Sequence, residues 1–231
     1  MTVSERSDTP ATPEPRPRRA ARRAWRLLCD PPFRQMMMLV WWPKRAAFQP
    51  FNDTRPDRYP CIFKFVQAAL GAERALDILS FGCATGEEVF SLRRLLQEDG
   101  LLERALVYAT DINPVVLEKA RQGIFPIAAV RQHTANYQAA GGKRAFSDYY
   151  SAAYNSARFD PGLIRNVTFA DHSLATDMVF SETHFISCRN VLIYFNRTLQ
   201  NRAFGLFHES LCHRGFLGLG SKESLYFSTF A

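Results

Sequence analysis

Cysteine is scarce in this chain, and its placement excludes two classes of small protein. The 231 residues include five cysteines, an odd number, and no two of them form a Cys-x-x-Cys pair. A disulfide framework needs paired cysteines, and a structural zinc site needs closely spaced ligands. The five histidines also lack metal-ligand spacing. The sequence therefore predicts a protein of a reducing compartment, with neither a disulfide framework nor a metal.

Long hydrophobic runs are missing as well. The longest apolar stretch near the start, residues 36–42, has seven residues, whereas a membrane-spanning helix needs about 20. The first 24 residues are rich in proline and arginine and lack the apolar core of a signal peptide. From these absences we expect a soluble, cytoplasmic protein.

Positive charge is concentrated near the start of the chain. Residues 1–60 contain 12 Lys/Arg and 6 Asp/Glu, a net charge of +6, whereas residues 61–231 contain 17 and 16, a net charge of +1. We expect a disordered basic tail over residues 1–24 and irregular structure with short helices between the prolines of residues 25–60. The simplest interpretation of the tail is a solvated segment; the functional alternative is electrostatic contact with a membrane or an acidic partner.

Apolar runs and helical patterns alternate from residue 61 onward. The patterns predict strands at 76–82, 105–111, 166–170, 184–188 and 215–220. They predict helices at 61–70, 87–100, 113–123 and about 197–213. Residues 124–165 are polar and aromatic and interrupt this alternation, which indicates an insertion with its own small structure. Strands that alternate with helices predict an α/β fold, a doubly wound and mostly parallel sheet.

The loop after the first predicted strand, within "SFGCATGEEVF" (residues 80–90), carries the chemistry. Nucleotide cofactors bind at such strand–helix loops. The loop is not a Walker loop, since no Gly-Lys-Ser/Thr follows, and it does not match Gly-x-Gly-x-x-Gly. Glu87 and Glu88 would repel a pyrophosphate. A cationic cofactor without phosphates, S-adenosylmethionine, fits these acids, although acidic residues are also favoured at the start of any helix.

A second acidic residue supports the cofactor interpretation. Asp111 ends the second predicted strand, where a carboxylate can accept hydrogen bonds from both ribose hydroxyls. Its alternative role is to cap the following helix, which has Pro114 near its first turn. The combination of loop, acid and strand order is more specific than either residue pattern alone, and it favours S-adenosylmethionine.

Five motifs then appear in a fixed order between residues 76 and 225. They are "GCATGEE" (82–88), "YATDIN" (108–113), "LEKARQGIF" (117–125), "CRNVLIYF" (188–195) and "GLGSKESL" (218–225). With them the chain resembles the CheR-type chemotaxis-receptor methyltransferases, which use S-adenosylmethionine to esterify glutamate side chains. The resemblance implies a chemotaxis receptor cytoplasmic domain, or another signalling protein, as the partner. It also implies that residues 124–167 form a small β-subdomain, which some members use to hold a receptor tail.

The resemblance assigns site residues by position. The implied cofactor contacts are Gly82, Cys83, Thr85, Gly86, Glu87, Asp111, Ile112, Ser173 and Leu174. The implied catalytic residues are Arg189, Asn190 and Tyr194. Because a carboxylate is already ionised at neutral pH, its methylation needs no general base. Arg189 would pair with the acceptor carboxylate, and Tyr194 would donate to it or line the methyl site; the alternatives are a surface ion pair and an ordinary packed aromatic.

The chain also departs from the family pattern. Ser173 stands where the family usually has asparagine, and residues 1–60 do not resemble the family's N-terminal helical domain. The sequence ends at Ala231, where the fold usually adds an antiparallel pair of strands, so we expect residues 215–220 at an open sheet edge. The family's Thr-x-Phe-Phe-Arg element is missing, and its arginine has three unproven substitutes: Arg45, Arg55 and Arg58.

Two other functions remain open from the sequence. The first is a truncated or degenerate methyltransferase fold that serves as a binding module. The second is a methyltransferase for another acceptor, a small molecule or a nucleic acid. "DPPF" (30–33) has the form of the catalytic element of amino-methylating enzymes, but no strand leads into it. We therefore interpret those four residues as a turn capped by aspartate.

Overall fold

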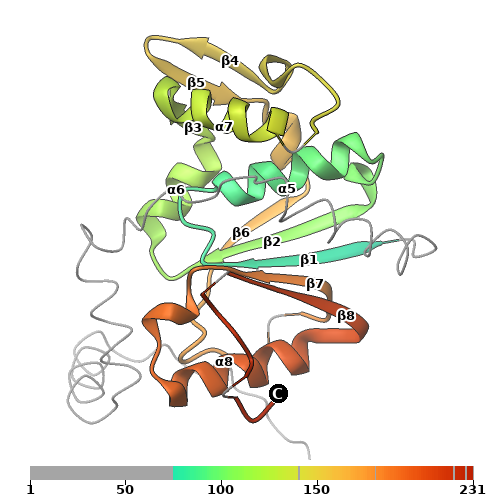
Figure 1. Ribbon diagram of the computed structural model, residues 1–231, viewed down its shortest axis with the longest axis vertical. Coiled ribbons are helices and arrows are strands. Elements are labelled where there is room, and N and C mark those ends of the chain that lie inside the picture. The colour runs from blue at the N-terminus through green and yellow to red at the C-terminus, as the bar shows by residue number, and fades with distance from the viewer. Residues whose placement is uncertain (1–74, 140, 180, 221, 227, 231) are drawn as a thin grey trace, which may run out of the picture.

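A five-stranded parallel sheet forms the centre of the molecule (Figure 1). The computed structural model describes residues 75–139, 141–179, 181–220, 222–226 and 228–230. The strands are β1 (Leu76–Phe81), β2 (Ala105–Asp111), β6 (Val167–Asp171), β7 (Thr183–Cys188) and β8 (Leu211–Leu219). Their order across the sheet is β6-β2-β1-β7-β8. The chain thus winds outward from β1 in both directions, which makes the carboxyl ends of β1 and β7 the switch point of the sheet.

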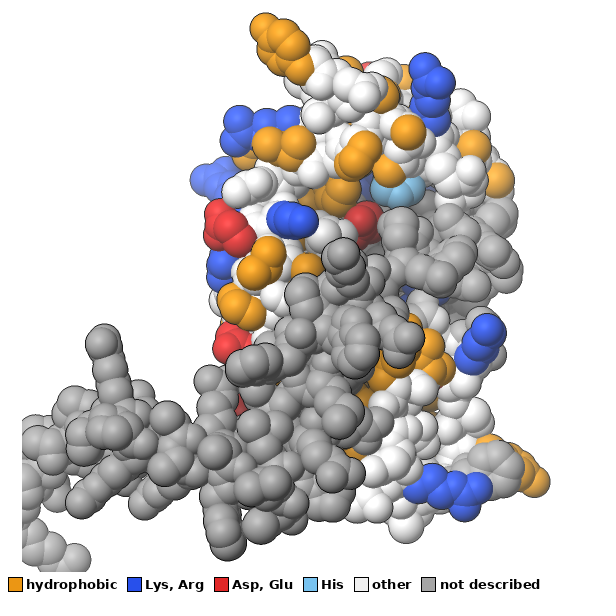
Figure 2. Space-filling view, turned by 90° about the vertical axis from the view of Figure 1, so that its left-hand side faces the viewer, with side chains coloured by type: hydrophobic (Ala, Val, Ile, Leu, Met, Phe, Trp, Pro, Cys, Tyr) orange, Lys and Arg blue, Asp and Glu red, His pale blue; other side chains and the backbone are white. Residues whose placement is uncertain are grey.

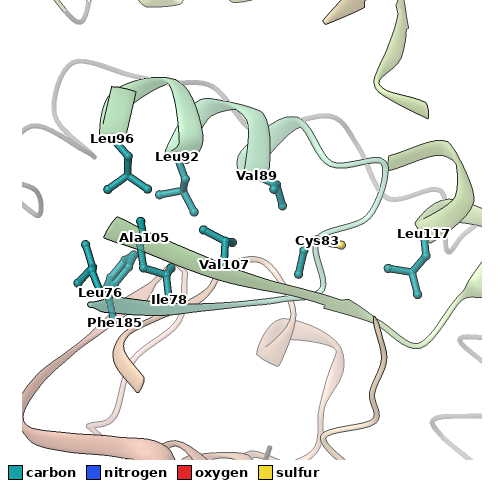
Figure 3. Packing of buried hydrophobic residues seen from close by; sticks show 11 residues of the cluster. Leu76, Ile78, Cys83, Val89, Leu92, Leu96, Ala105, Val107, Leu117 and Phe185 are labelled. Atoms are coloured by element: carbon teal, nitrogen blue, oxygen red, sulfur yellow. The ribbon is translucent and has the colours of Figure 1, made fainter. Parts of the chain in front are cut away.

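Helices cover both faces of this sheet (Figure 1). α5 (Glu87–Glu98) and α6 (Pro114–Gln122) lie on one face, and α8 (Arg197–Ser210) lies on the other. Successive residues of β1 point to opposite faces of the sheet. Ile78 packs in the core on the α5 side, and Leu79 packs in the core on the α8 side. Figure 3 shows the first of these cores, in which Leu92 and Leu96 of α5 point at the strands. The predicted doubly wound α/β fold is confirmed.

Local sequence explains where the helices begin and end. Asn113 caps α6, because its side chain accepts a hydrogen bond from the Val115 N–H at 3.0 Å. Pro114 then occupies the first turn, and Gly123 ends the helix in a left-handed conformation, with φ 60°. Asn196 caps α8 in the same way as Asn113 caps α6.

The insertion is a second, smaller α/β unit. Its strands are β3 (Ile124–Pro126), β4 (Tyr150–Ala153) and β5 (Ser156–Phe159), and they pair antiparallel in the order β3-β5-β4. Its helices are α7 (Ile127–Ala139) and the 3₁₀ turns η2 (Phe146–Tyr149) and η3 (Pro161–Ile164). The inserted β-subdomain is therefore confirmed, and it also contains a helix of 13 residues.

This subdomain packs against the outer face of α5. The ring of Phe90 lies 5.2 Å from that of Phe159, centroid to centroid. The next contacts are polar: the Arg93 Nε donates to the Leu163 carbonyl at 2.6 Å. The Arg94 guanidinium lies 4.0 Å above the centroid of the Tyr137 ring. Both arginines are buried, and burial lowers the pKa of Arg93 to about 10. α5 is thus shared between the sheet and the insertion.

The last described strand differs from the expectation. β8 begins at Leu211, directly after α8 ends at Ser210, whereas the pattern predicted a helix to about 213 and a strand only from 215. The register with β7 shifts between Thr183 and Phe185, so the first part of β8 is irregular. Within the described residues β8 forms the edge of the sheet, with β7 as its single neighbour, as expected.

Several expectations fall outside the described part of the chain. They concern the tail (1–24), the irregular segment (25–60), the "DPPF" turn, the helix at 61–70 and the three arginines Arg45, Arg55 and Arg58. Among the helices that the structure does describe, none is long and apolar enough to cross a membrane.

Candidate functional site

The loop between β1 and α5 has a left-handed backbone at three positions. The φ angles are 65° at Gly82, 48° at Ala84 and 93° at Gly86. A Cβ added at Gly82 would clash with the Val191 side chain, and one added at Gly86 would lie 3.2 Å from the Ala120 Cα. Glycine is therefore required at both ends of the loop, by backbone conformation and by space. The two glycines thus let the loop pack closely against Val191 and Ala120.

Asp111 holds this loop from the end of β2. Its Oδ2 accepts from the Ala84 N–H at 3.0 Å, and its Oδ1 accepts from the Asn113 N–H at 2.9 Å. The Cys83 N–H donates to the Thr110 carbonyl at 2.9 Å and adds a second link. Burial raises the pKa of Asp111, and the hydrogen bonds that it accepts from backbone N–H groups offset only part of this rise. The cap of the following helix is Asn113, so the capping role that the sequence left open for Asp111 is wrong.

The two glutamates after the loop have different partners. Glu87 is half-buried, and its two carboxylate oxygens lie 2.6 and 2.7 Å from the Thr85 hydroxyl that donates to them. Glu88 is buried and accepts a hydrogen bond from the Ser187 hydroxyl. Its Oε2 also lies 4.0 Å from the Arg189 Nη1. Glu87 thus bonds to its own loop through Thr85, whereas Glu88 connects α5 to the end of β7.

The three predicted catalytic residues lie on the segment that follows β7. Arg189 is buried, which excludes the alternative of a surface ion pair, and the Glu88 carboxylate offsets its charge. Asn190 has a left-handed backbone, with φ 59°. Tyr194 ends the 3₁₀ turn η4 (Leu192–Tyr194) and is half-buried. Burial, followed by the charge of Glu223, raises the pKa of Tyr194, so its hydroxyl remains a proton donor at neutral pH.

The segment after β6 supplies the other two predicted contacts. The His172 N–H donates to the Asp111 carbonyl at 3.3 Å, which places this segment beside the end of β2. Ser173 is buried, its N–H donates to the Asp177 Oδ2 at 2.8 Å, and Leu174 packs in the α8-side core. Ile112, half-buried, completes the set between β2 and α6.

All predicted site residues therefore lie at the carboxyl edge of the sheet, which is the side where β1, β2, β6 and β7 end. Direct contacts join the loop to Asp111, and Glu88 joins α5 to Arg189. Tyr194 stands on the same segment as Arg189, five positions further along the chain. Sequence reasoning missed Ser187 and the pairing role of Glu88. No local signal reveals them, because the two residues are 99 positions apart.

The charges of this edge suit a cationic ligand with a ribose. The loop and the first turn of α5, residues 82–88, contain no Lys or Arg; Glu88 pairs with Arg189, so the negative charge toward a ligand comes from Glu87 and from Asp111 beside the loop. A pyrophosphate would meet like charge here, whereas a sulfonium or an ammonium group would meet opposite charge. The residues present thus fit S-adenosylmethionine. Within the described residues no group of His, Cys, Asp and Glu has the geometry of a metal site.

A small surface hollow adjoins the start of α5 on the side of the insertion. Glu87 and Arg94 of α5 border it together with aromatic side chains of the subdomain. Figure 2 shows this side of the molecule, with hydrophobic side chains gathered around a histidine below the top of the inserted subdomain. The insertion thus reaches the residues that begin α5.

Comparison with known proteins gives consistent results. The family model described as "CheR methyltransferase, SAM binding domain" matches residues 60–229. A Pseudomonas putida protein provisionally named methyltransferase Cher3 is 52% identical over 206 residues, which cover 89% of this chain and 74% of that protein. A chemotaxis protein methyltransferase of Listeria monocytogenes is 28% identical, over 65% of this chain and 54% of its own length. Chemotaxis protein methyltransferase 2 of Pseudomonas aeruginosa is 30% identical, over 72% and 59%. The chain thus spans less than two thirds of the last two relatives.

Proposed function

The chain belongs to the CheR methyltransferase family, and on that premise we propose that it methylates glutamate carboxylates of a chemotaxis receptor or a related signalling protein. The reaction class, methyl transfer, and the cofactor, S-adenosylmethionine, are those of the matched domain and agree with the sequence interpretation. The acceptor is the proposed part. Two relatives are named as chemotaxis protein methyltransferases, and this chain covers about half to three fifths of each of them.

The observation that carries the proposal is the buried Arg189–Glu88 pair at the same sheet edge as the glycine loop. Glu88 lies beside the guanidinium at the end of β7 and offsets its charge there. A guanidinium has five N–H donors in a planar fork and is able to contact a second carboxylate besides the first. Arg189 therefore supports an anionic acceptor, and Tyr194, whose hydroxyl remains protonated, supports a second hydrogen bond to it.

The other residues of the edge bind and orient. Gly82 and Gly86 let the backbone approach the amino-acid part of the cofactor, Glu87 attracts its ammonium group, and Asp111 accepts from its ribose hydroxyls. When bound, S-adenosylmethionine supplies a sulfonium methyl group that a carboxylate oxygen attacks, with the electrons of the broken C–S bond left on sulfur. The protein's contribution is alignment and exclusion of water, since an ionised glutamate needs no general base.

Two thiols near this edge are held unreactive. Burial, with the charges of Asp111 and Glu88, raises the pKa of Cys83 well above its ordinary value. Burial, with Glu223 and Glu88, does the same for Cys188. A thiol is nucleophilic only as a thiolate. Neither cysteine therefore competes with the acceptor carboxylate for the methyl group.

A labelled methyl-transfer assay tests this proposal. The protein is incubated with S-adenosylmethionine carrying a labelled methyl group and with the purified cytoplasmic domain of a chemotaxis receptor. The expected product is a methyl ester on the receptor, which mild base releases as labelled methanol. The control acceptor is the same domain with its exposed glutamates changed to alanine. Base-stable label, or label on added nucleic acid, contradicts the proposal. Cofactor binding without any transfer favours the binding-module alternative.

A further inference from the structure

Glu223 has none of the site roles assigned so far. Its carboxylate nevertheless accepts hydrogen bonds from four backbone N–H groups. Its Oε1 accepts from Val191 at 2.8 Å and from Leu192 at 2.7 Å. Its Oε2 accepts from Asn190 at 2.9 Å and from Gly220 at 2.6 Å. One side chain thus joins the segment after β7 to the chain that follows β8.

The backbone around Glu223 is shaped for this carboxylate. A Cβ added at Gly220 would lie 2.6 Å from the Glu223 Oε2 and 3.0 Å from the Asn190 N, so the position requires glycine. The left-handed conformation of Asn190, with φ 59°, directs its N–H to the same point as the next two. Successive N–H groups that converge in this way form an anion-binding nest, and here the anion belongs to the protein itself.

We propose that Glu223 is a positioning residue for methyl transfer. It acts through residues 190–192, which lie between Arg189 and Tyr194 in the chain. Its hydrogen bonds to these residues thereby set how the Arg189 and Tyr194 side chains face the acceptor. The role in methyl transfer rests on the proposed function, whereas the four hydrogen bonds of Glu223 do not. The cofactor loop packs against Val191 at Gly82, but it also has links of its own: the Ala84 N–H donates to Asp111 and the Cys83 N–H to the Thr110 carbonyl. Loss of Glu223 should therefore affect the acceptor side more than the cofactor side.

Electrostatics support the same role. The charge of Glu223 contributes, after burial, to the raised pKa values of Tyr194 and Cys188. The carboxylate thereby extends to higher pH the range in which the Tyr194 hydroxyl is protonated, and it also accepts hydrogen bonds from the turn on which Tyr194 stands.

The test compares Glu223→Gln, Glu223→Asp and a control, Glu209→Gln, which removes an exposed glutamate of α8. Hydrogen exchange of the amides of Asn190, Val191, Leu192 and Gly220 is followed by NMR. Glutamine keeps the length of glutamate but has one acceptor oxygen, and its NH₂ opposes the remaining donors. We expect these amides to exchange roughly 10- to 100-fold faster in Glu223→Gln, with Glu223→Asp between it and the wild type.

Kinetics and titration complete the test. In Glu223→Gln, kcat for transfer to the receptor domain should fall about tenfold or more, while KM for S-adenosylmethionine stays within about twofold. The pKa of Tyr194 should fall toward its ordinary value of 10.0. If Glu223→Gln fails to fold, Glu223→Asp is measured in its place.

The outcomes separate this proposal from the proposed function. Unchanged exchange of the four amides overturns the inference, and so does faster exchange with unchanged kcat and an unchanged Tyr194 titration. If the wild type methylates no receptor domain, the proposed function fails on its own. The amide exchange and the Tyr194 titration then still decide the role of Glu223, since they need no acceptor.

Discussion

The carboxyl edge of the parallel sheet and the inserted subdomain both rest on α5, but on opposite faces of it. The face toward the sheet carries Val89, Leu92 and Leu96 and packs in an aliphatic core (Figure 3). The opposite face carries Phe90 and Arg94, and buried Arg93 lies between the two faces, where it contacts both the insertion and β2. One helix thus supports the chemistry from its first turn and the insertion from its later turns.

The two regions are held by different forces. The sheet is stabilised by apolar side chains from both of its faces, a non-directional interaction that tolerates small shifts. The insertion packs on Phe90 through its own aromatic core and adds directional contacts. The Glu98 Oε1 accepts from the Tyr137 hydroxyl at 2.5 Å and from the Tyr149 hydroxyl at 2.7 Å. Arg94 lies over the Tyr137 ring and 3.9 Å from Glu98. Loss of one buried polar partner should therefore affect the insertion more abruptly than loss of one methyl group affects the sheet.

The largest expected effect comes from Arg93→Leu, which removes the anchor shared by the two regions. Arg93 donates to the Leu163 carbonyl in the insertion and to the Ala105 carbonyl at the start of β2. Both carbonyls lose a buried, charged donor in the variant, so the free energy of unfolding should fall by about 3–5 kcal/mol. Urea unfolding followed by circular dichroism measures it. The control is Arg131→Leu, on an exposed face of α7. A loss below about 1 kcal/mol would show that the insertion is held by its apolar contacts alone.

Asp111→Ala tests the sheet edge without touching the insertion. We expect affinity for S-adenosylhomocysteine to fall by roughly 1–3 kcal/mol, because ribose hydrogen bonds and the anchor of the Ala84 N–H are both lost. Titration calorimetry measures the affinity. Asp148→Ala, which removes the same charge from an exposed position in the insertion, is the control and should bind normally. Unchanged affinity in Asp111→Ala would remove the cofactor-site assignment.

The third prediction concerns how the transfer rate depends on pH through Tyr194. Burial and Glu223 raise the pKa of Tyr194 above its ordinary value of 10.0, which means that the neutral, donating form persists to higher pH. The ratio of transfer rates for wild type and Tyr194→Phe should therefore stay nearly constant from pH 7 to pH 9, since Tyr194 remains almost fully protonated in that range. Paired rate profiles on the receptor domain measure it. A ratio that already falls below pH 9 contradicts the assigned environment of Tyr194.

The smallest expected effect lies at the tip of the insertion, far from both anchors. Tyr154 and Asn155 form the turn between β4 and β5, with φ 47° and 63°, and Tyr154 is fully exposed. Tyr154→Asn should raise the free energy of unfolding by about 0.5 kcal/mol, since asparagine tolerates a left-handed backbone better than tyrosine does. Asn155→Ala should lower it by a similar amount for the same reason. Thermal unfolding measures both, and a change of the same sign in the two variants would contradict this account of the turn.

Sequence reasoning was most successful where the signal was local. The loop with Gly82 and Gly86 and the helix that begins at Pro114 were predicted within a few residues of their observed positions. It failed where a residue's partner is remote. Arg93 and Arg94 have the sequence signature of an exposed helix face, and only the insertion that covers them explains their burial. The role of Asp111 toward Ala84 depends in the same way on the pairing of β1 with β2.

The sequence by itself determined the order of strands and helices, the glycine loop and the class of cofactor. Those features follow from hydrophobic periodicity, from glycines that allow a left-handed backbone, and from the sign of nearby charges, all of which are read within a few residues. Only the tertiary structure decided that Glu88 faces Arg189 and that Glu223 holds the turn beneath Tyr194. The physical reason is that the carboxyl ends of parallel strands meet through strand order and register, which bring together side chains 99 positions apart, as in Glu88 and Ser187.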